Sequence, residues 1–220
     1  MSLIHTWLLV ISALLIRLIF PNNKRYWVIL AASVLAIYWL QPAIQIRQMD
    51  FWFPTASIGL VLISWGVTAD REAARLFENQ MSGIFVISLV VMIALTRFIS
   101  LEGMVTASRP PQFAWVVLAL TLIAGATLYL VYSRKTTKSR IITVIILIFS
   151  IMIILKNPVL SLWTSIRLRS LLAQTPTLAK KTDLAWLGFS YLAFRIIHSL
   201  IDRLNGRLKE IKLGDYIIYT

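Results

Sequence analysis

Four polar residues within an otherwise apolar segment have types and a spacing that could do chemistry. They are Tyr191, Arg195, His198 and Asp202, at relative positions i, i+4, i+7 and i+11. Because an α-helix repeats every 3.6 residues, this spacing places all four on one helix face over about three turns. Such a face can line a cavity that handles a polar substrate, or it can hold its helix in a bundle through hydrogen bonds. The residue types alone leave both open and name no reaction.

Arg195 is the most demanding of the four to place. An arginine near the middle of a membrane helix costs about 3 kcal/mol on insertion scales, so we expect it to face the protein interior or a wet cavity. Asp202 lies about 10 Å further along the helix axis, too far for a direct ion pair. We therefore expect partners for Arg195 from other parts of the chain, with His198 close enough to both residues to bridge a network.

Other kinds of site find little support in the sequence. There is no cysteine, which excludes disulfides, thiolate nucleophiles and cysteine metal sites. Only His5 and His198 could serve as imidazole bases, and His5, near the start of the first apolar segment, has no neighbouring carboxylate. No metal-binding, glycine-rich phosphate-binding or serine-nucleophile motif is present, so we expect neither a metal nor a cofactor.

The elements that position the polar face must be membrane helices. The chain has 220 residues, of which 59% are hydrophobic and 14% charged, and its mean hydropathy is +0.80. A soluble domain of this size cannot cover so much apolar surface, so we predict an all-α polytopic membrane protein whose main partner is the lipid bilayer. The formal net charge of +13 comes from short basic clusters between apolar segments. That pattern sets membrane topology, and we expect no nucleic-acid partner.

Seven segments are candidates for membrane spans, because a helix needs about 20 apolar residues to cross the hydrocarbon core. They cover residues 2–20, 26–44, 51–67, 82–100, 112–133, 140–156 and 184–204. The first is expected to be retained, since no positive charge precedes its apolar run and no small-residue cleavage site follows. The seventh is the least uniformly apolar and carries the polar face. A short surface helix with a topological role is expected over residues 70–78.

The chain is predicted to have three parts. Residues 1–156 form a six-helix membrane bundle, residues 157–183 an amphipathic segment at the interface, and residues 184–220 the seventh helix and the start of a following apolar element.

The amphipathic segment shows its character in its sequence. Trp163 and several leucines interleave with Arg167 and Arg169, as in helices that lie in the membrane interface. Pro158 suits the first turn of such a helix, and Pro176 ends it. The first, third and fifth connections between spans hold more lysine and arginine than the second and fourth, so we expect the N-terminus outside.

Two strings of the third part carry a family resemblance. The first is Leu187-Gly-Phe-Ser-Tyr-x-x-Phe-Arg-x-Ile-His-x-Leu-x-Asp202, and Gly206, a basic spacer and Leu213-Gly-Asp-Tyr216 follow it. Together they resemble the central signature of the membrane-bound O-acyltransferase (MBOAT) family, above all its bacterial branch of alginate O-acetylation and teichoic-acid D-alanylation proteins. The resemblance covers residues 184–220. It implies transfer of an acyl group to a hydroxyl acceptor and a place in the bacterial inner membrane.

The resemblance also limits the function expected of this chain alone. In the family, a histidine in a helix further downstream acts as the base that deprotonates the acceptor hydroxyl. His198 aligns with an earlier position of the signature, so no catalytic residue is assigned. We expect the front portion of an acyltransferase, inactive alone, with a membrane protein partner that supplies or replaces the missing part. The alternatives are a non-catalytic accessory subunit of a larger membrane complex, derived from a truncated gene, and a small transporter.

Overall fold

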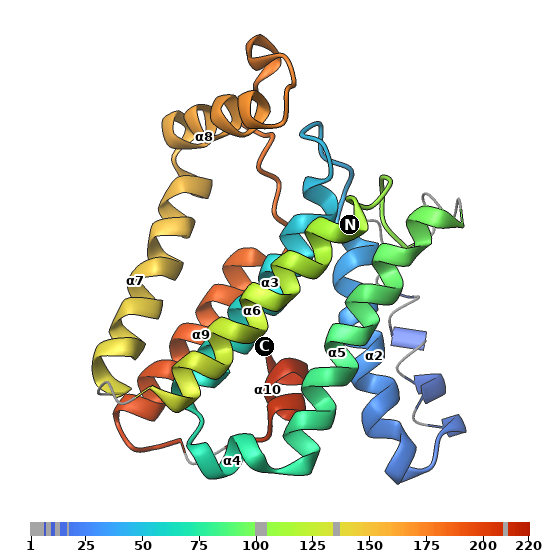
Figure 1. Ribbon diagram of the computed structural model, residues 1–220, viewed down its shortest axis with the longest axis vertical. Coiled ribbons are helices and arrows are strands. Elements are labelled where there is room, and N and C mark those ends of the chain that lie inside the picture. The colour runs from blue at the N-terminus through green and yellow to red at the C-terminus, as the bar shows by residue number, and fades with distance from the viewer. Residues whose placement is uncertain are drawn as a thin grey trace.

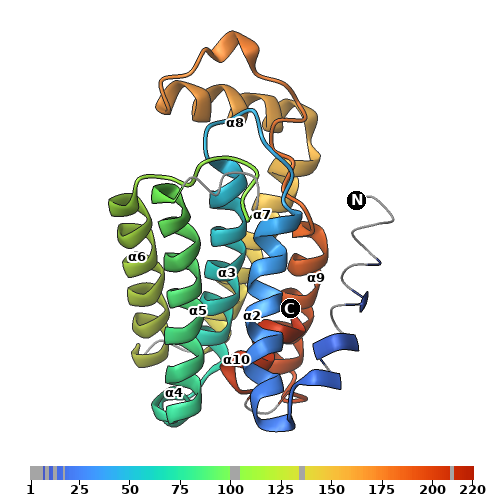
Figure 2. The same ribbon diagram turned by 90° about the vertical axis from the view of Figure 1, so that its right-hand side faces the viewer.

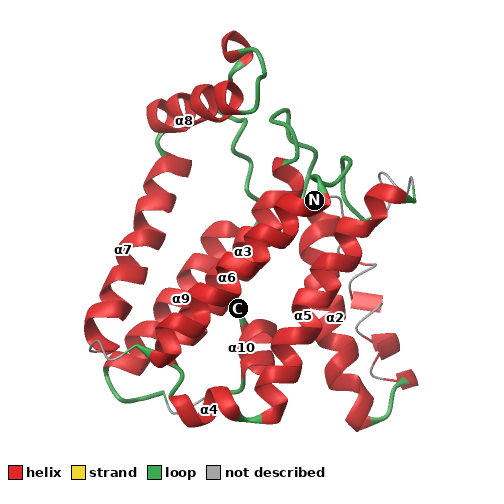
Figure 3. Cartoon of the chain, viewed as in Figure 1, coloured by secondary structure: helices red, strands yellow, loops and turns green. Residues whose placement is uncertain are grey.

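The described part of the chain is helical throughout. The computed structural model describes residues 7, 10–11, 14–16, 18–99, 105–133, 137–208 and 211–220, and His5 lies outside them. Within these ranges every regular element is a helix, as the colouring of Figure 3 shows. The expected all-α class is therefore confirmed for this part of the protein.

A bundle of long helices surrounds α3 (Figures 1 and 2). The long helices are α2 (Asn22–Leu40), α3 (Met49–Thr68), α5 (Phe77–Leu95), α6 (Phe113–Tyr132), α7 (Thr137–Lys156) and α9 (Phe189–Leu204). The shorter ones are α4 (Arg71–Arg75), η1 (Thr96–Phe98), α8 (Pro158–Leu171), η2 (Pro176–Leu178) and α10 (Leu213–Tyr219). α3 is the most buried spanning helix, with 78% of its apolar window covered, against 28% for α5.

Four helices are long and apolar enough to cross a membrane. They are Met49–Thr68, Phe77–Phe98, Phe113–Tyr132 and Lys138–Lys156. These correspond to the third to sixth predicted spans. The fourth begins earlier than predicted, because the chain bends at Leu76 and the helix starts directly at Phe77. The described residues thus support four spanning helices and not seven.

The second and seventh predicted spans differ from the helices observed. α2 carries Lys24 in its first turn and ends at Leu40, so its apolar part is short. α9 has 16 residues because residues 184–187 are not helical. There the Gln41 side chain donates to Ala185 O (2.8 Å) and accepts from Leu187 N (3.2 Å), which satisfies the backbone outside a helix. Gly188 then turns the chain into α9 with a φ of +71°. The first predicted span lies largely outside the described residues.

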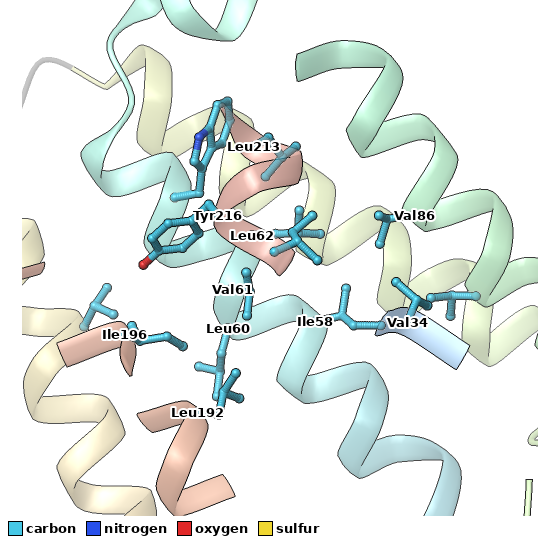
Figure 4. Packing of buried hydrophobic residues seen from close by; sticks show 14 of the residues in the cluster. Val34, Ile58, Leu60, Val61, Leu62, Val86, Leu192, Ile196, Leu213 and Tyr216 are labelled. Atoms are coloured by element: carbon cyan, nitrogen blue, oxygen red, sulfur yellow. The ribbon is translucent and has the colours of Figure 1, made fainter. Parts of the chain in front are cut away.

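The buried core centres on α3 (Figure 4). Val61 and Leu62 of α3 lie among side chains from α2, α5, α9 and α10, including Val34, Val86, Ile196 and Tyr216. On its other side α3 packs closely against α6. A Cβ at Gly66 would lie 3.0 Å from Thr127 O, so only glycine allows this approach. The centre of the bundle is therefore set by small and apolar residues of one helix.

α8 lies across one end of the bundle (Figures 1 and 2), as a helix at a membrane interface would. Asn157 caps it by accepting from the backbone of Val159 and Leu160. Its apolar side chains are exposed, among them Trp163 and Leu171. The amphipathic pattern was predicted, but Arg169 is buried against the connection that follows, rather than placed on a solvated face.

Asp183 is the partner that draws Arg169 inward. Its Oδ2 accepts hydrogen bonds from Ser165 Oγ (2.6 Å), from Nε and an Nη of Arg169 (3.0 and 2.9 Å) and from Lys180 N (3.0 Å). Burial works to raise the pKa of this carboxyl, but the hydrogen bonds and the Arg169 charge outweigh it, so the pKa lies below its ordinary value. The Asp183 carboxylate thereby fixes the connection 172–188 to α8.

Ion pairs join the connections between helices at the end of the bundle opposite α8. Arg203, near the end of α9, pairs with Asp70 before α4 (3.2 Å), and Lys212 pairs with Glu78 of α5. Arg71 of α4 donates to Tyr132 O at the end of α6 (2.9 Å). Of the short surface helix expected over residues 70–78, only Arg71–Arg75 form α4, and Phe77 and Glu78 begin α5.

Candidate functional site

α9 has one buried and one open face. Leu192, Ile196 and Leu200 are buried, whereas Tyr191 is 59% exposed and the His198 side chain 69% exposed. The spacing rule is therefore correct, since Tyr191, Arg195, His198 and Asp202 share one side of the helix. Of the two places expected for Arg195, the protein interior is filled by the apolar face of α9, and Arg195 lines a groove on the open face. Arg195 is half-buried at the surface.

Arg195 lies between two tyrosine rings. Its guanidinium carbon is 4.6 Å from the ring centroid of Tyr191, one turn earlier, and 4.6 Å from that of Tyr219 in α10. An Nη of Arg195 also donates a hydrogen bond to Tyr219 O. A cation at the carboxyl end of a helix satisfies carbonyls that have no partner within the helix. The expected partner of Arg195 from elsewhere in the chain is thus Tyr219.

His198 pairs with Asp202 one turn later. Its Nε2 lies 3.2 Å from Asp202 Oδ2, and the Asp202 side chain is 24% exposed. Among the described residues, His198 contacts this carboxylate rather than Arg195, so the bridging role expected for it is not what the structure shows. The face therefore consists of two units, a cation between tyrosines and an imidazole beside a carboxylate.

A groove of about 420 Å³ runs along this face. Its lining residues are Tyr191, Phe194, Arg195, Ile197, His198, Ile201 and Tyr219. The volume is within the range of small-molecule sites. Its polar groups are a guanidinium, an imidazole and phenolic hydroxyls, while Phe194 and Ile201 make part of the wall apolar. The groove can therefore hold a molecule with one polar and one apolar part.

Hydrogen bonds from two helices, α3 and α5, hold α10 in position. Asn79 of α5 accepts from Leu213 N (2.8 Å), and Trp65 of α3 donates to Ile211 O (3.0 Å). Further along, the Tyr216 hydroxyl donates to Ser64 Oγ of α3 (3.1 Å). Sequence reasoning did not single out Ser64, Asn79 or Tyr219. A buried asparagine inside a spanning helix was the one available signal, since buried amides need partners.

Among the described residues, no group of three or more histidine, cysteine, aspartate or glutamate side chains could hold a metal ion. No family model, no curated protein and no solved structure matches this chain.

Arg195→Ala is expected to lower the free energy of unfolding by about 1–3 kcal/mol, because it removes a hydrogen bond and two cation–π contacts. Thermal unfolding in mild detergent, followed by fluorescence of the eight tryptophans, measures the change. His198→Ala is the matched control, since its side chain is largely exposed. Arg195→Lys should recover only part of the loss because lysine lacks the planar guanidinium. Equal unfolding temperatures for Arg195→Ala and His198→Ala would contradict the structural role of Arg195.

Proposed function

We propose that the chain is the front part of an MBOAT-like O-acyltransferase and that the groove on α9 forms one wall of the chamber for acyl transfer to a hydroxyl. The observation that carries the proposal is the contact between the two strings of the signature. The string that ends at Asp202 forms α9, and the string that begins at Leu213 forms α10. Arg195 joins the two helices through Tyr219. Residues that share a signature thus share a site.

The chemistry of the groove suits this role in part. An acyl donor and a hydroxyl acceptor present carbonyl and hydroxyl oxygens, which a guanidinium and an imidazole can bind. General-base catalysis needs a titratable group within hydrogen-bond reach of the acceptor. In the resemblance His198 does not correspond to that base. The proposal therefore requires a further histidine, from a membrane protein partner or from a segment outside these 220 residues, and gives Arg195 and His198 binding roles.

The proposal includes a place in the bacterial inner membrane. Under this proposal the membrane holds seven segments. They are the four long apolar helices together with α2, α9 and residues 2–20. The N-terminus then lies outside, and the end of the bundle with α4 and the ion pairs of Arg203 and Lys212 lies in the cytoplasm. This orientation places the more basic end inside.

The decisive experiment follows acylation in cells. A strain that lacks the gene is complemented with wild type, Arg195→Ala, His198→Ala or Arg207→Ala, and ester-linked acyl groups on envelope polymers are measured by mass spectrometry. Loss of the gene and Arg195→Ala should each lower acylation by about tenfold or more, a change of at least about 1.4 kcal/mol in barrier or affinity. Arg207→Ala, outside the groove, should leave acylation unchanged at equal protein level. Unaltered acylation in the deletion strain would refute the proposal.

The open face of α9 favours a second candidate, an accessory subunit of a larger membrane complex. Phe194 and Tyr191 are 61% and 59% exposed beside a half-buried arginine, a composition that suits contact with a partner helix. Mass spectrometry of the intact protein with everything that co-purifies in mild detergent separates the two candidates. A partner with an intramembrane histidine supports the acyltransferase, and an unrelated complex supports the accessory subunit.

A further inference from the structure

A second groove lies between α5 and α6, on the other side of α10 from the groove on α9. Its volume is about 350 Å³. α3 and α10 contribute Leu62 and Leu213, while Gly83 and Ala124 are small residues on α5 and α6. Figure 1 shows α5 and α6 with α10 near one end of the space between their ribbons. α10 contributes Leu213 to this groove and Tyr219 to the other, and the two grooves have no lining residue in common.

Three of the four polar side chains in the wall of this groove are fully partnered, and the fourth, Gln80, is exposed, with its Nε2 3.5 Å from Ala74 O. Thr127 Oγ1 donates to Ile123 O within its own helix (2.8 Å). Asn79 is occupied by Ala73 O and Leu213 N, and Trp65 Nε1 by Ile211 O. A polar ligand would find few groups to bind there, because hydrogen bonds are what specify such ligands. An apolar chain needs none, so the walls favour a hydrocarbon chain.

The position of the groove indicates that the hydrocarbon chain comes from a membrane lipid. Both walls belong to helices that are long and apolar enough to cross a membrane, and 28% or less of each apolar window is buried. At the mouth, Ile84 is 57% exposed and Leu128 is 55% exposed. In a bilayer such side chains face the acyl chains of lipids, which are the apolar phase around spanning helices.

One end of the groove keeps an excess of one positive charge, because Asp70 pairs with Arg203 and Glu78 with Lys212, which leaves Arg71 and Arg75 against Glu72. Ala74 of α4 lines it, and the neighbouring Arg71 and Arg75 are exposed. Arg71 ties α4 to the end of α6 through Tyr132 O, which fixes this end of the groove. The adjoining Phe77 is 74% exposed. Basic and aromatic residues at the end of a spanning helix are characteristic of the headgroup region and attract anionic lipids.

We propose that the groove between α5 and α6 binds one acyl chain of an anionic phospholipid, with the phosphate beside Arg75. The observations behind it are the apolar walls, their mostly partnered polar side chains and the small excess of positive charge at one end. None of these depends on acyl transfer, so this site stands or falls independently of the proposed enzyme. The lipid is a bound component of the bundle and not a substrate.

The test uses the purified full chain in mild detergent and native mass spectrometry, with phosphatidylglycerol or phosphatidylcholine added. Ala124→Leu extends a side chain into the groove. Gly125→Leu is the matched control, because a Cβ there meets no atom within 4 Å and the residue does not line the groove. Displacing two methylenes of the bound chain should weaken binding by about tenfold. We expect that loss for Ala124→Leu and wild-type retention of one phosphatidylglycerol for Gly125→Leu.

Two further variants keep the test decisive. Gly83→Leu fills the groove from the opposite wall, where an added Cβ would meet Leu213 Cδ2 at 3.4 Å, and it should lose the lipid even if Ala124→Leu folds poorly. Arg75→Gln should still bind the acyl chain of a lipid but lose the preference for phosphatidylglycerol over phosphatidylcholine. Equal lipid retention in Ala124→Leu, Gly83→Leu and Gly125→Leu would overturn the proposal. So would a wild-type dimer that the groove variants abolish, because a second copy of the chain would then fill the site.

Discussion

Asp183→Ala is expected to lower the free energy of unfolding by about 3–5 kcal/mol, because it leaves the Arg169 guanidinium buried without its carboxylate. The side chains of Arg169 and Asp183 are only 4% and 2% exposed, so water cannot replace the lost partner. Ser165 Oγ and Lys180 N lose their acceptor as well. The connection 172–188 should then detach from α8. Denaturant unfolding in mild detergent, followed by tryptophan fluorescence, measures the effect.

The control variants separate the stability lost by leaving a buried charge unpaired from the stability lost through altered packing. Ser165→Ala removes one donor of the same network and should cost only about 1 kcal/mol. The double variant Arg169→Met with Asp183→Leu should be more stable than Asp183→Ala alone, because no charge is left unpaired. A double variant as unstable as Asp183→Ala would show that packing, and not the unpaired charge, causes the loss.

Acid should act on the same pair in the wild type. The pKa of Asp183 is lowered in the folded state from an ordinary 3.8, so the unfolded chain takes up the proton at a higher pH than the folded protein does. The stabilising contribution is therefore present above about pH 3.8 and is lost as the pH falls further toward the folded pKa. Asp183→Ala removes this component of the pH dependence.

Gly214→Ala is expected to destabilise the protein by about 1–3 kcal/mol, the usual cost of overpacking. A Cβ at this position would lie 1.7 Å from Tyr26 Oη and 3.1 Å from Ser82 Oγ, inside the space where α10 meets α2 and α5. Either Tyr26 turns away and loses its contact with Ser82, or α10 shifts and weakens the contact between Tyr219 and Arg195. Thermal unfolding reports the loss of stability.

Gly83→Ala is the matched control for Gly214→Ala, since its Cβ would make only an ordinary contact with Leu213 Cδ2 at 3.4 Å. It should leave the unfolding temperature unchanged or slightly raised. Tyr26→Ala combined with Gly214→Ala should cost less than the sum of the single changes, because the first makes room for the second. Additive losses would show that the tyrosine is not what excludes a side chain at position 214.

Local periodicity predicted much of α9 correctly. The spacing of Tyr191, Arg195, His198 and Asp202 gives one face on any straight helix, and α9 shows it. Hydropathy likewise predicted the four long apolar helices. Hydropathy overestimated the length of α9, because apolar residues such as Leu184 and Leu187 fit an extended segment as well as a helix. The Gln41 side chain that binds this segment is far away in sequence.

The remaining features depend on contacts between distant residues. α10 was expected only as the start of an apolar element, and its length and position follow from Asn79, Trp65 and Ser64 on two other helices. The inward turn of Arg169 depends on Asp183, which a helical pattern within residues 158–171 does not include. The acyltransferase resemblance stays a prediction, because it concerns chemistry and not helix positions.

The position of α10 makes it a common wall between two sites. Its first residue, Leu213, lines the groove between α5 and α6, and its last, Tyr219, lines the groove on α9. A helix of seven residues is only about 10 Å long, so its two ends are close together. A molecule that displaced α10 from one side would change the affinity of the other side, and thermodynamic linkage would make that change reciprocal. With such a displacement, the lipid proposed for the groove between α5 and α6 would act as an effector of the groove on α9.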